Sequence, residues 1–147
     1  MEKSTRIMSN LLRCISKNIE KYAQDAAFVA LKSYEGDMKN RVHNKGLNSQ
    51  GSKIGDYSTE AWKKYRLSQG KQVRYVDFEV HEDFRDSLTT GQSKGDAVLG
   101  YTTDLSKKIH DGQTEHFGVF SNPTTLELRD FQDRFSDELN SKIGKCR

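Results

Sequence analysis

The chain opens with a long amphipathic pattern. When residues 8–30 are placed 100° apart, the apolar side chains fall within one arc of about 120°, and no polar residue enters that arc. We therefore predict one long N-terminal helix over residues 1–43. The apolar stripe consists of Met8, Leu11, Leu12, Ile15, Ile19, Tyr22, Ala23, Ala26, Val29 and Ala30.

This stripe has two interpretations. In the first, it covers the domain's own sheet. In the second, part of it packs on a neighbouring subunit, because a helix of about 30 residues spans roughly 45 Å, which is longer than a compact domain of this size needs. Phe28 and Leu31 lie on the other side of the helix. Their position favours the second interpretation and makes both of them candidate contact residues.

The segment 44–57 has the composition of a loop. It contains three glycines, several Asn and Ser residues and few apolar side chains. At about fourteen residues it is long for a connection, and loops of this length are often functional. We predict an extended loop that reaches a partner, with the candidate contact residues Lys45, Leu47, Lys53, Ile54 and Tyr57.

Residues 58–122 are predicted to form an α/β core with three short helical segments. Ser58 is a candidate N-cap for the first, which Gly70 ends. Apolar spacing predicts one helical turn at 83–88. The third segment begins at residue 103 or 104 and ends at Gly112.

Two strands are predicted in the same region. The segment Val73–Val80 alternates apolar and acidic residues, which predicts a strand whose Asp77 and Glu79 face water. Ala97–Tyr101 is predicted to pair with it as an antiparallel strand, and residues 115–120 are expected to be extended. The aromatic residues assigned to the core are Trp62, Phe78 and Phe117.

The C-terminal helix, over residues 123–147, has the clearest local signals. Thr124 and Glu127 have the spacing of a capping box, directly after Pro123. One face of the helix then carries Leu128, Phe131, Phe135 and Leu139. The fold class predicted for the single domain 1–147 is α+β, with a long N-terminal helix and a C-terminal helix packed on a small, mainly antiparallel sheet.

Composition adds that this domain is folded but polar. Hydrophobic residues make up 33% of the 147 residues and charged residues 31%, whereas the 10% of aromatic residues argues against disorder. The net charge is +3, and the basic residues cluster only in pairs such as Lys63-Lys64. Nucleic-acid binders usually show a concentrated basic patch, so this signal is weak.

Two cysteines, Cys14 and Cys146, lie near opposite ends of the sequence. Charged residues interrupt the first 20 positions, which therefore lack the apolar run of about 7–15 residues that a secretory signal needs. We expect a protein made and kept in the cytosol, where cysteines stay reduced.

The search for chemistry predicts no catalytic, cofactor or metal site. The four histidines include no pair at helical ligand spacing, and His110, Glu115 and His116 are the nearest approach to a metal cluster. The acidic residues between Asp77 and Asp86 are more typical of a solvated surface than of an acid–base pair. The glycine-rich run Gly91–Asp96 lacks the arrangement that wraps phosphate.

The order of several short motifs is more informative. KIGDYST (53–59) is followed by Trp62, by Arg66 and by Gly70-Lys71-Gln72. The later motifs are YVDF (75–78), FRDSL (84–88), VLGY (98–101), EHFG (115–118) and NPT (122–124). This order, over about residues 50–140, resembles the phage virion morphogenesis (tail completion) and related tail-component families of tailed bacteriophages.

The resemblance implies a structural virion protein without catalysis. It implies a neck or tail-completion subunit that forms a homo-oligomeric ring at the head–tail interface. The expected partners are the head adaptor or portal, the tail tube or terminator, and genomic DNA in the channel. Two alternatives stay open: a small basic DNA-binding or regulatory module, and an enzyme that uses the acidic or histidine cluster.

Overall fold

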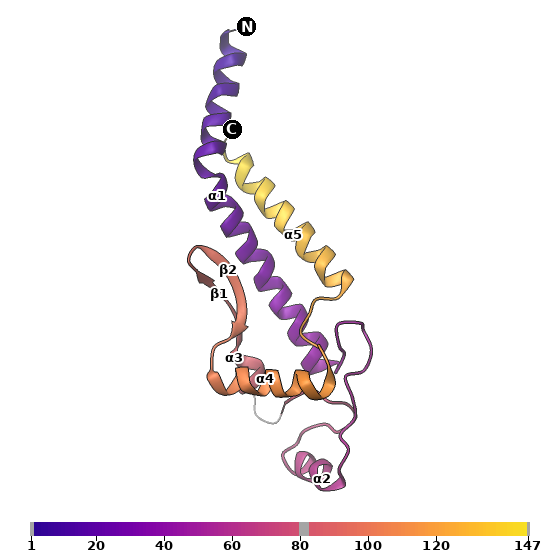
Figure 1. Cartoon of the computed structure of the whole chain (residues 1–147). Coiled ribbons are helices and arrows are strands. Elements are labelled where there is room, and N and C mark those ends of the chain that lie inside the picture. The colour runs from indigo at the N-terminus through magenta and orange to yellow at the C-terminus, as the bar shows by residue number, and fades with distance from the viewer. Residues whose placement is uncertain (1, 80–82, 147) are drawn as a thin grey trace.

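The computed structural model describes residues 2–79 and 83–146, and α1 (Glu2–Lys39) forms its long axis. The N-terminus lies at one end of the molecule and helix α2 (Glu60–Ser68) at the other (Figure 1). A π-helical turn, η1 (Asn40–Asn44), continues α1 directly. The predicted long N-terminal helix is therefore confirmed, with a changed hydrogen-bond pattern in its last turn.

Helix α5 (Thr125–Gly144) runs antiparallel to α1 along much of its length (Figure 1). The predicted capping box is confirmed: Thr124 Oγ1 accepts a hydrogen bond from the Glu127 amide at 3.1 Å, and Glu127 Oε2 accepts one from the Thr124 amide at 2.8 Å. Near the other end of α5, Lys142 Nζ lies 3.3 Å from Asp25 Oδ2 of α1.

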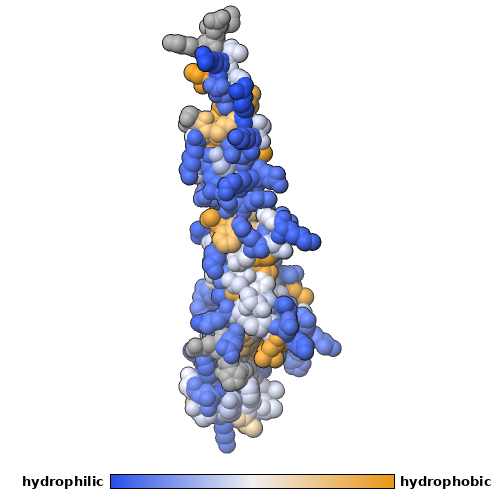
Figure 2. Space-filling model, turned by 90° about the vertical axis from the view of Figure 1, so that its left-hand side faces the viewer, coloured by the Kyte–Doolittle hydropathy of each residue, from blue (hydrophilic) through white to orange (hydrophobic). Residues whose placement is uncertain are grey.

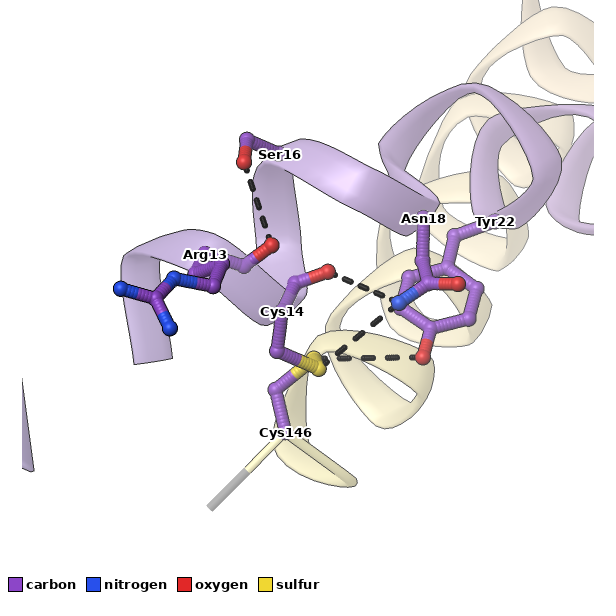
Figure 3. The surroundings of a disulfide bond; sticks show 6 residues. All are labelled: Arg13, Cys14, Ser16, Asn18, Tyr22 and Cys146. Atoms are coloured by element: carbon purple, nitrogen blue, oxygen red, sulfur yellow. Dashed lines mark hydrogen bonds between the residues drawn. A yellow bond between two sulfur atoms is a disulfide. The ribbon is translucent and has the colours of Figure 1, made fainter. Parts of the chain in front are cut away.

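The two cysteines are joined by a disulfide, so the prediction of free thiols is wrong. Cys14 and Cys146 are 132 positions apart in sequence, but the antiparallel path of α5 brings their Cα atoms to 5.7 Å (Figure 3). Asn18 Nδ2 donates to the Cys14 carbonyl oxygen at 2.8 Å on the same turn. The disulfide ties the end of α5 to α1, and α1 continues beyond Cys14 towards the N-terminus.

We expect Cys146→Ser to lower the free energy of unfolding by about 2–5 kcal/mol, because a cross-link closing a long loop restricts the unfolded chain. Urea denaturation without reductant measures the loss. Reductant should produce a similar loss in the wild type and no further loss in the variant. Equal stability of the oxidised wild type and the variant would contradict the expectation.

The sheet is an antiparallel hairpin of β1 (Leu88–Ser93) and β2 (Asp96–Tyr101), with Leu88 opposite Tyr101. Lys94 and Gly95 both have positive φ, 52° and 92°. This combination suits a two-residue hairpin turn. Helix α1 packs against both strands, and the predicted α+β fold class is confirmed.

Glu35 fastens α1 to this hairpin. Its carboxylate accepts a hydrogen bond from the Thr90 amide of β1 at 2.8 Å and pairs with Lys32 and Lys39 of α1 at 2.8 and 2.9 Å. Burial raises the pKa of this carboxyl, but the bonds from Lys32, Lys39 and Thr90 outweigh that effect and hold it at about 2. The group therefore stays ionised at neutral pH.

The partner predicted for β2 was wrong. Residues 73–79 run as an irregular segment, and Val80 lies outside the described residues. Within that segment Val76 donates its amide to the Gly55 carbonyl at 3.0 Å, and Phe78 has a positive φ of 56°. The alternation of apolar and acidic residues therefore does not mark the two faces of a strand. Each of these apolar and acidic side chains is buried or half-buried in its own surroundings. The actual partner, LTTGQS, has only one strongly apolar residue and gave no strand signal.

Two helix boundaries also differ from the prediction. Thr59, and not Ser58, caps α2. Helix α4 (Asp104–Phe117) passes through Gly112 and ends at Gly118, so residues 115–117 are helical and not extended. A glycine costs only about 1 kcal/mol inside a helix, and packing of Ile109 and Phe117 against the core outweighs it. The predicted turn at 83–88 is confirmed as α3 (Asp83–Ser87).

The core lies where the C-terminal end of α1 meets α3, α4 and the segments between the helices. Phe78 is buried and Phe117 packs against the core, as predicted, whereas Trp62 is half-buried and stacks on Tyr65 with ring centroids 5.3 Å apart. The buried apolar residues of this cluster are Tyr34, Met38, Val42, Ile54, Val76, Phe78, Phe84, Leu88 and Phe120.

The apolar stripe of α1 divides into two parts. Ala26 and Ala30 are fully buried, whereas Met8 and Leu12 are 56% and 59% exposed and the neighbouring Ile7 is 69% exposed. Hydrophobic residues stand among hydrophilic ones along one face of the elongated molecule (Figure 2). Burial along the stripe is uneven, because Val29 in its C-terminal part is 45% exposed and Leu11 and Ile15 in its N-terminal part are half-buried. Helix α1 packs against the hairpin, as in the first interpretation, and also against α5, whereas Met8 and Leu12 stay exposed.

Candidate functional site

An open groove is lined by Trp62 of α2 and by residues of α3 and α4. These helices lie at the end of the molecule farthest from the N-terminus (Figure 1). Its volume is about 840 Å³. The walls are largely apolar, and three carboxylates, Asp56, Asp83 and Asp86, stand among the polar lining residues. The apolar lining consists of Trp62, Val76, Phe78, Phe84, Leu105, Ile109 and Phe117.

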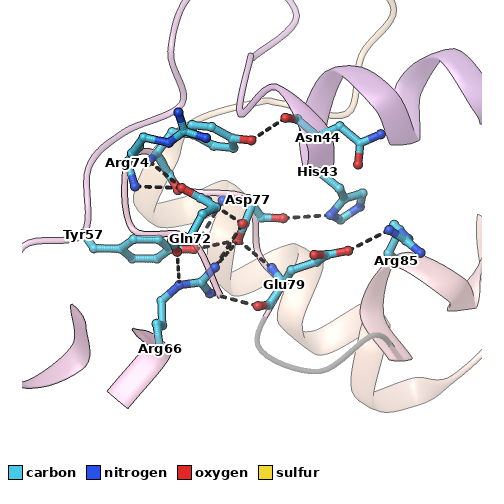
Figure 4. A network of polar contacts seen from close by, with 10 residues as sticks. His43, Asn44, Tyr57, Arg66, Gln72, Arg74, Asp77, Glu79 and Arg85 are labelled. Atoms are coloured by element: carbon cyan, nitrogen blue, oxygen red, sulfur yellow. Dashed lines mark hydrogen bonds and ion pairs between the residues drawn. The ribbon is translucent and has the colours of Figure 1, made fainter. Parts of the chain in front are cut away.

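A buried ion pair holds α2 in place beside this groove. The guanidinium of Arg66 is 1% exposed and its Nη2 donates to both carboxylate oxygens of Asp77, at 2.8 and 2.9 Å (Figure 4). Its remaining donors reach the carbonyl oxygens of Gln72 at 3.0 Å and Glu79 at 2.9 Å. Arg66 thus connects α2 to several points along the irregular segment 72–79.

Tyr57 links the preceding loop to the same pair. Its ring lies beneath the Arg66 guanidinium, 4.3 Å from ring centroid to carbon, and its hydroxyl donates to Asp77 Oδ1 at 2.8 Å. Burial raises the pKa of the Tyr57 hydroxyl, so the phenol stays protonated and serves as a donor. The segment 55–59, which contributes Asp56 and Thr59 to the groove, is positioned in this way.

The prediction that Asp77 and Glu79 face water is wrong. Asp77 is 2% exposed and forms the ion pair, and Glu79 Oε1 lies 2.8 Å from Arg85 Nη1 of α3. The prediction assumed a strand, in which alternate residues share a face. Because the segment is irregular, successive side chains turn inwards. The sequence did contain one signal for this pair. Arg66 lies on the predicted helix with no acidic residue three or four positions away, which indicates a partner elsewhere in the chain.

Arg66→Ala should lower the free energy of unfolding by about 3–5 kcal/mol, because it leaves the Asp77 carboxylate buried without its counter-charge. Urea denaturation measures the change. Lys63→Ala is the matched control on the same helix. It removes only a solvent-exposed pair with Glu60, for which the expected loss is below about 1 kcal/mol. Equal losses in the two variants would contradict a special role for the buried pair.

His43 is a buried neutral base next to this network. Its Nδ1 lies 2.7 Å from the Asp77 carbonyl oxygen, which can only accept, so Nδ1 carries the proton. Nε2 is buried and has no hydrogen-bond partner among the described residues. Burial lowers the pKa of His43 to about 4; the bond to the Asp77 carbonyl opposes the shift and the nearby Arg85 reinforces it.

Stability should therefore fall as the pH falls from about 6.5 to 4. The unfolded chain takes up a proton on His43 in this window, whereas the folded protein does not, so acid favours unfolding by up to about 3 kcal/mol. Urea denaturation across this range measures the slope. His43→Gln should flatten it, and His116→Gln, which changes an exposed imidazole, should leave it unchanged. The same slope in His43→Gln would contradict the assignment.

A second buried ion pair organises the loop 44–57. Arg41 Nε donates to Glu127 Oε1 at 2.8 Å, and its other nitrogens reach the carbonyl oxygens of Leu47, Phe120 and Asn122 at 3.1, 2.9 and 2.9 Å. Leu47 and Lys53 form a bridge across the loop. The segment is a loop, as predicted, but it is folded against the domain and is not a free arm.

The predicted contact residues do not form one surface. Lys45 and Lys53 are exposed, Leu47 and Phe28 are half-buried, and Tyr57 belongs to the Arg66 network. Ile54 is buried in the core, and Leu31 packs against it. Sequence reasoning placed Ile54 on a mobile arm because the residues around it are polar and glycine-rich.

The groove is chiefly an apolar hollow, since two of its three carboxylates are already paired, Asp56 with Lys53 and Asp86 with Arg85. Among the described residues, no group of three or more His, Cys, Asp or Glu side chains is placed to hold a metal ion. His110 instead contacts Ser121 Oγ at 3.0 Å, and His116 lies against the Phe117 ring. No helix in the described part of the chain is both long and apolar enough to cross a bilayer.

Comparison with family models, with curated proteins and with solved structures returned no significant match. The motif order described above therefore stays the basis of the family resemblance.

Proposed function

We propose that the chain is a structural virion protein of a tailed phage, a neck or tail-completion subunit that forms a ring at the head–tail interface. The observation that carries the proposal is that one elongated subunit has two different apolar surfaces, one at each end. One is the N-terminal end of α1 and the other is the α2–α4 groove. The order of the short motifs over residues 50–140 supports it independently.

Ring subunits need such a shape. Each copy in a ring contacts one neighbour through one surface and the other neighbour through a different surface. An enzyme, by contrast, needs converging acid, base or nucleophilic groups. The groove offers three carboxylates and one imidazole around an apolar hollow, with no nucleophile and base in mutual contact among the described lining residues.

The charge of the chain suits a position around DNA. A net charge of +3, spread along the sequence, permits non-specific phosphate contacts without a sequence-reading element. The same charge also supports the alternative, a small basic DNA-binding or regulatory module. The two functions differ in what the protein associates with in the cell.

The deciding experiment is affinity purification of the tagged protein from infected cells, followed by mass spectrometry at moderate salt. We expect portal, head-adaptor, tail-tube or terminator proteins to be recovered, and the protein itself to be present in purified particles. The control is an unrelated protein of similar size and charge with the same tag. Proteins that are recovered with both baits are held by charge or by the tag and are discounted.

Recovery of nucleic acid without virion proteins, together with absence from purified particles, would overturn the proposal and favour the DNA-binding module. That module would also show an affinity for duplex DNA that falls linearly, on logarithmic axes, as salt rises. A metabolic partner recovered without virion proteins would instead revive the enzyme alternative.

A further inference from the structure

We propose that the first turns of α1 in one copy dock, through their apolar face, into the α2–α4 groove of the next copy. This inference rests on the proposed ring function and names the two surfaces that build it. Its partner is a second copy of this chain.

The donor surface is the part of α1 that lies beyond the disulfide. Helix α1 continues past Cys14 and past the end of α5 (Figure 1), and Ile7, Met8 and Leu12 are 69%, 56% and 59% exposed there. At 100° per residue these three side chains fall within an arc of about 140°. Helices that bind in grooves present such a face of closely spaced apolar anchors.

The acceptor surface is the groove. Its volume of about 840 Å³ falls within the range of about 300–1,000 Å³ found for pockets that bury a ligand. Trp62 of α2 and Leu105 of α4 belong to its lining, and Leu105 is 69% exposed. Val76, Phe78 and Phe84 are buried at its base. The apolar surface that the described part of the chain leaves open is therefore mainly that of Leu105, with the half-buried Trp62 beside it.

Charge favours this pairing of the two surfaces. The first 16 residues contain three basic side chains, Lys3, Arg6 and Arg13, and one acidic side chain. The helix N-terminus adds partial positive charge. The groove lining instead contains Asp56, Asp83 and Asp86. Asp56 pairs with Lys53 and Asp86 with Arg85, so Asp83 is the lining carboxylate that has no basic partner among the described residues. Opposite charges around two apolar surfaces favour docking of one on the other.

The segment cannot reach the groove of its own chain. A helix of the length of α1, 38 residues, spans roughly 57 Å, and the two surfaces lie near its opposite ends (Figure 1). Docking must therefore occur between copies. It joins two different surfaces, so each copy can bind one neighbour on either side, and the chain of copies closes into a ring when the rotation allows it.

The test uses two complementary variants of the full-length purified protein in sedimentation velocity. Met8→Asp with Leu12→Asp disables the donor surface, and Leu105→Lys places a repelling charge at the groove. These side chains are exposed, so each variant should keep its fold by circular dichroism. We expect the wild type to associate with rising concentration and each variant to associate about 30-fold more weakly, the loss typical of a central contact.

Mixing the two variants should restore one contact, because the donor variant keeps an intact groove and the groove variant keeps an intact donor. The expected product is a 1:1 dimer that grows no further. Leu126→Asp changes an exposed residue outside both surfaces and should associate as the wild type does. Raising the salt concentration should weaken association through screening.

Three results would overturn the inference. The first is a wild type that stays monomeric at all concentrations. The second is a Leu105→Lys variant that associates normally while the donor variant does not, since α1 would then pair with α1. The third is a mixture that stays monomeric. None of these results depends on recovery from infected cells. The inference can therefore fail while the proposed function holds, as for a virion protein that associates through other surfaces.

Discussion

Arg41 and Glu127 form an ion pair, at 2.8 Å, at the junction on which most of this structure depends. Arg41 lies in the last turn of the long N-terminal helix, and Glu127 also completes the capping box that starts α5. The remaining donors of Arg41 hold the loop 44–57 and the segment before α5 by their carbonyl oxygens. Removing either partner would leave a buried charge unpaired, which is usually more costly than losing a surface pair.

Paired charges do in this chain what a larger apolar core does in others. Hydrophobic residues make up only 33% of the sequence, and the apolar cluster is confined to one region near the end of α1. Beside it, Arg66 and Asp77 hold α2 and Glu35 holds the hairpin, and far from it a disulfide holds the end of α5. The contacts of Arg66 and Glu35 fix direction as well as distance, since charge-assisted hydrogen bonds have demanding geometry.

This construction leaves two apolar surfaces uncovered and far apart. Helix α1 carries the exposed N-terminal turns beyond its disulfide to the end of α5, and the Arg66 network positions α2 beside the groove at the other end. A subunit of this shape is suited to repeated contacts with copies of itself. The proposed function follows from that geometry together with the motif order.

The sequence by itself determined the features that depend on neighbours a few residues apart. The amphipathic stripe predicted α1, the Thr124–Glu127 spacing predicted the start of α5, and the mixed pattern predicted the α+β class. Helix periodicity and capping are local, so they can be recognised without knowing the fold. The tertiary structure alone decided which distant residues meet. It joined Cys14 to Cys146, buried Asp77 against Arg66 and drew Ile54 into the core. It also formed the groove from α2, α3 and α4 and left Met8, Leu12, Ile19 and Val29 of the α1 stripe exposed, because burial depends on what packs against a residue and not on its pattern along the chain.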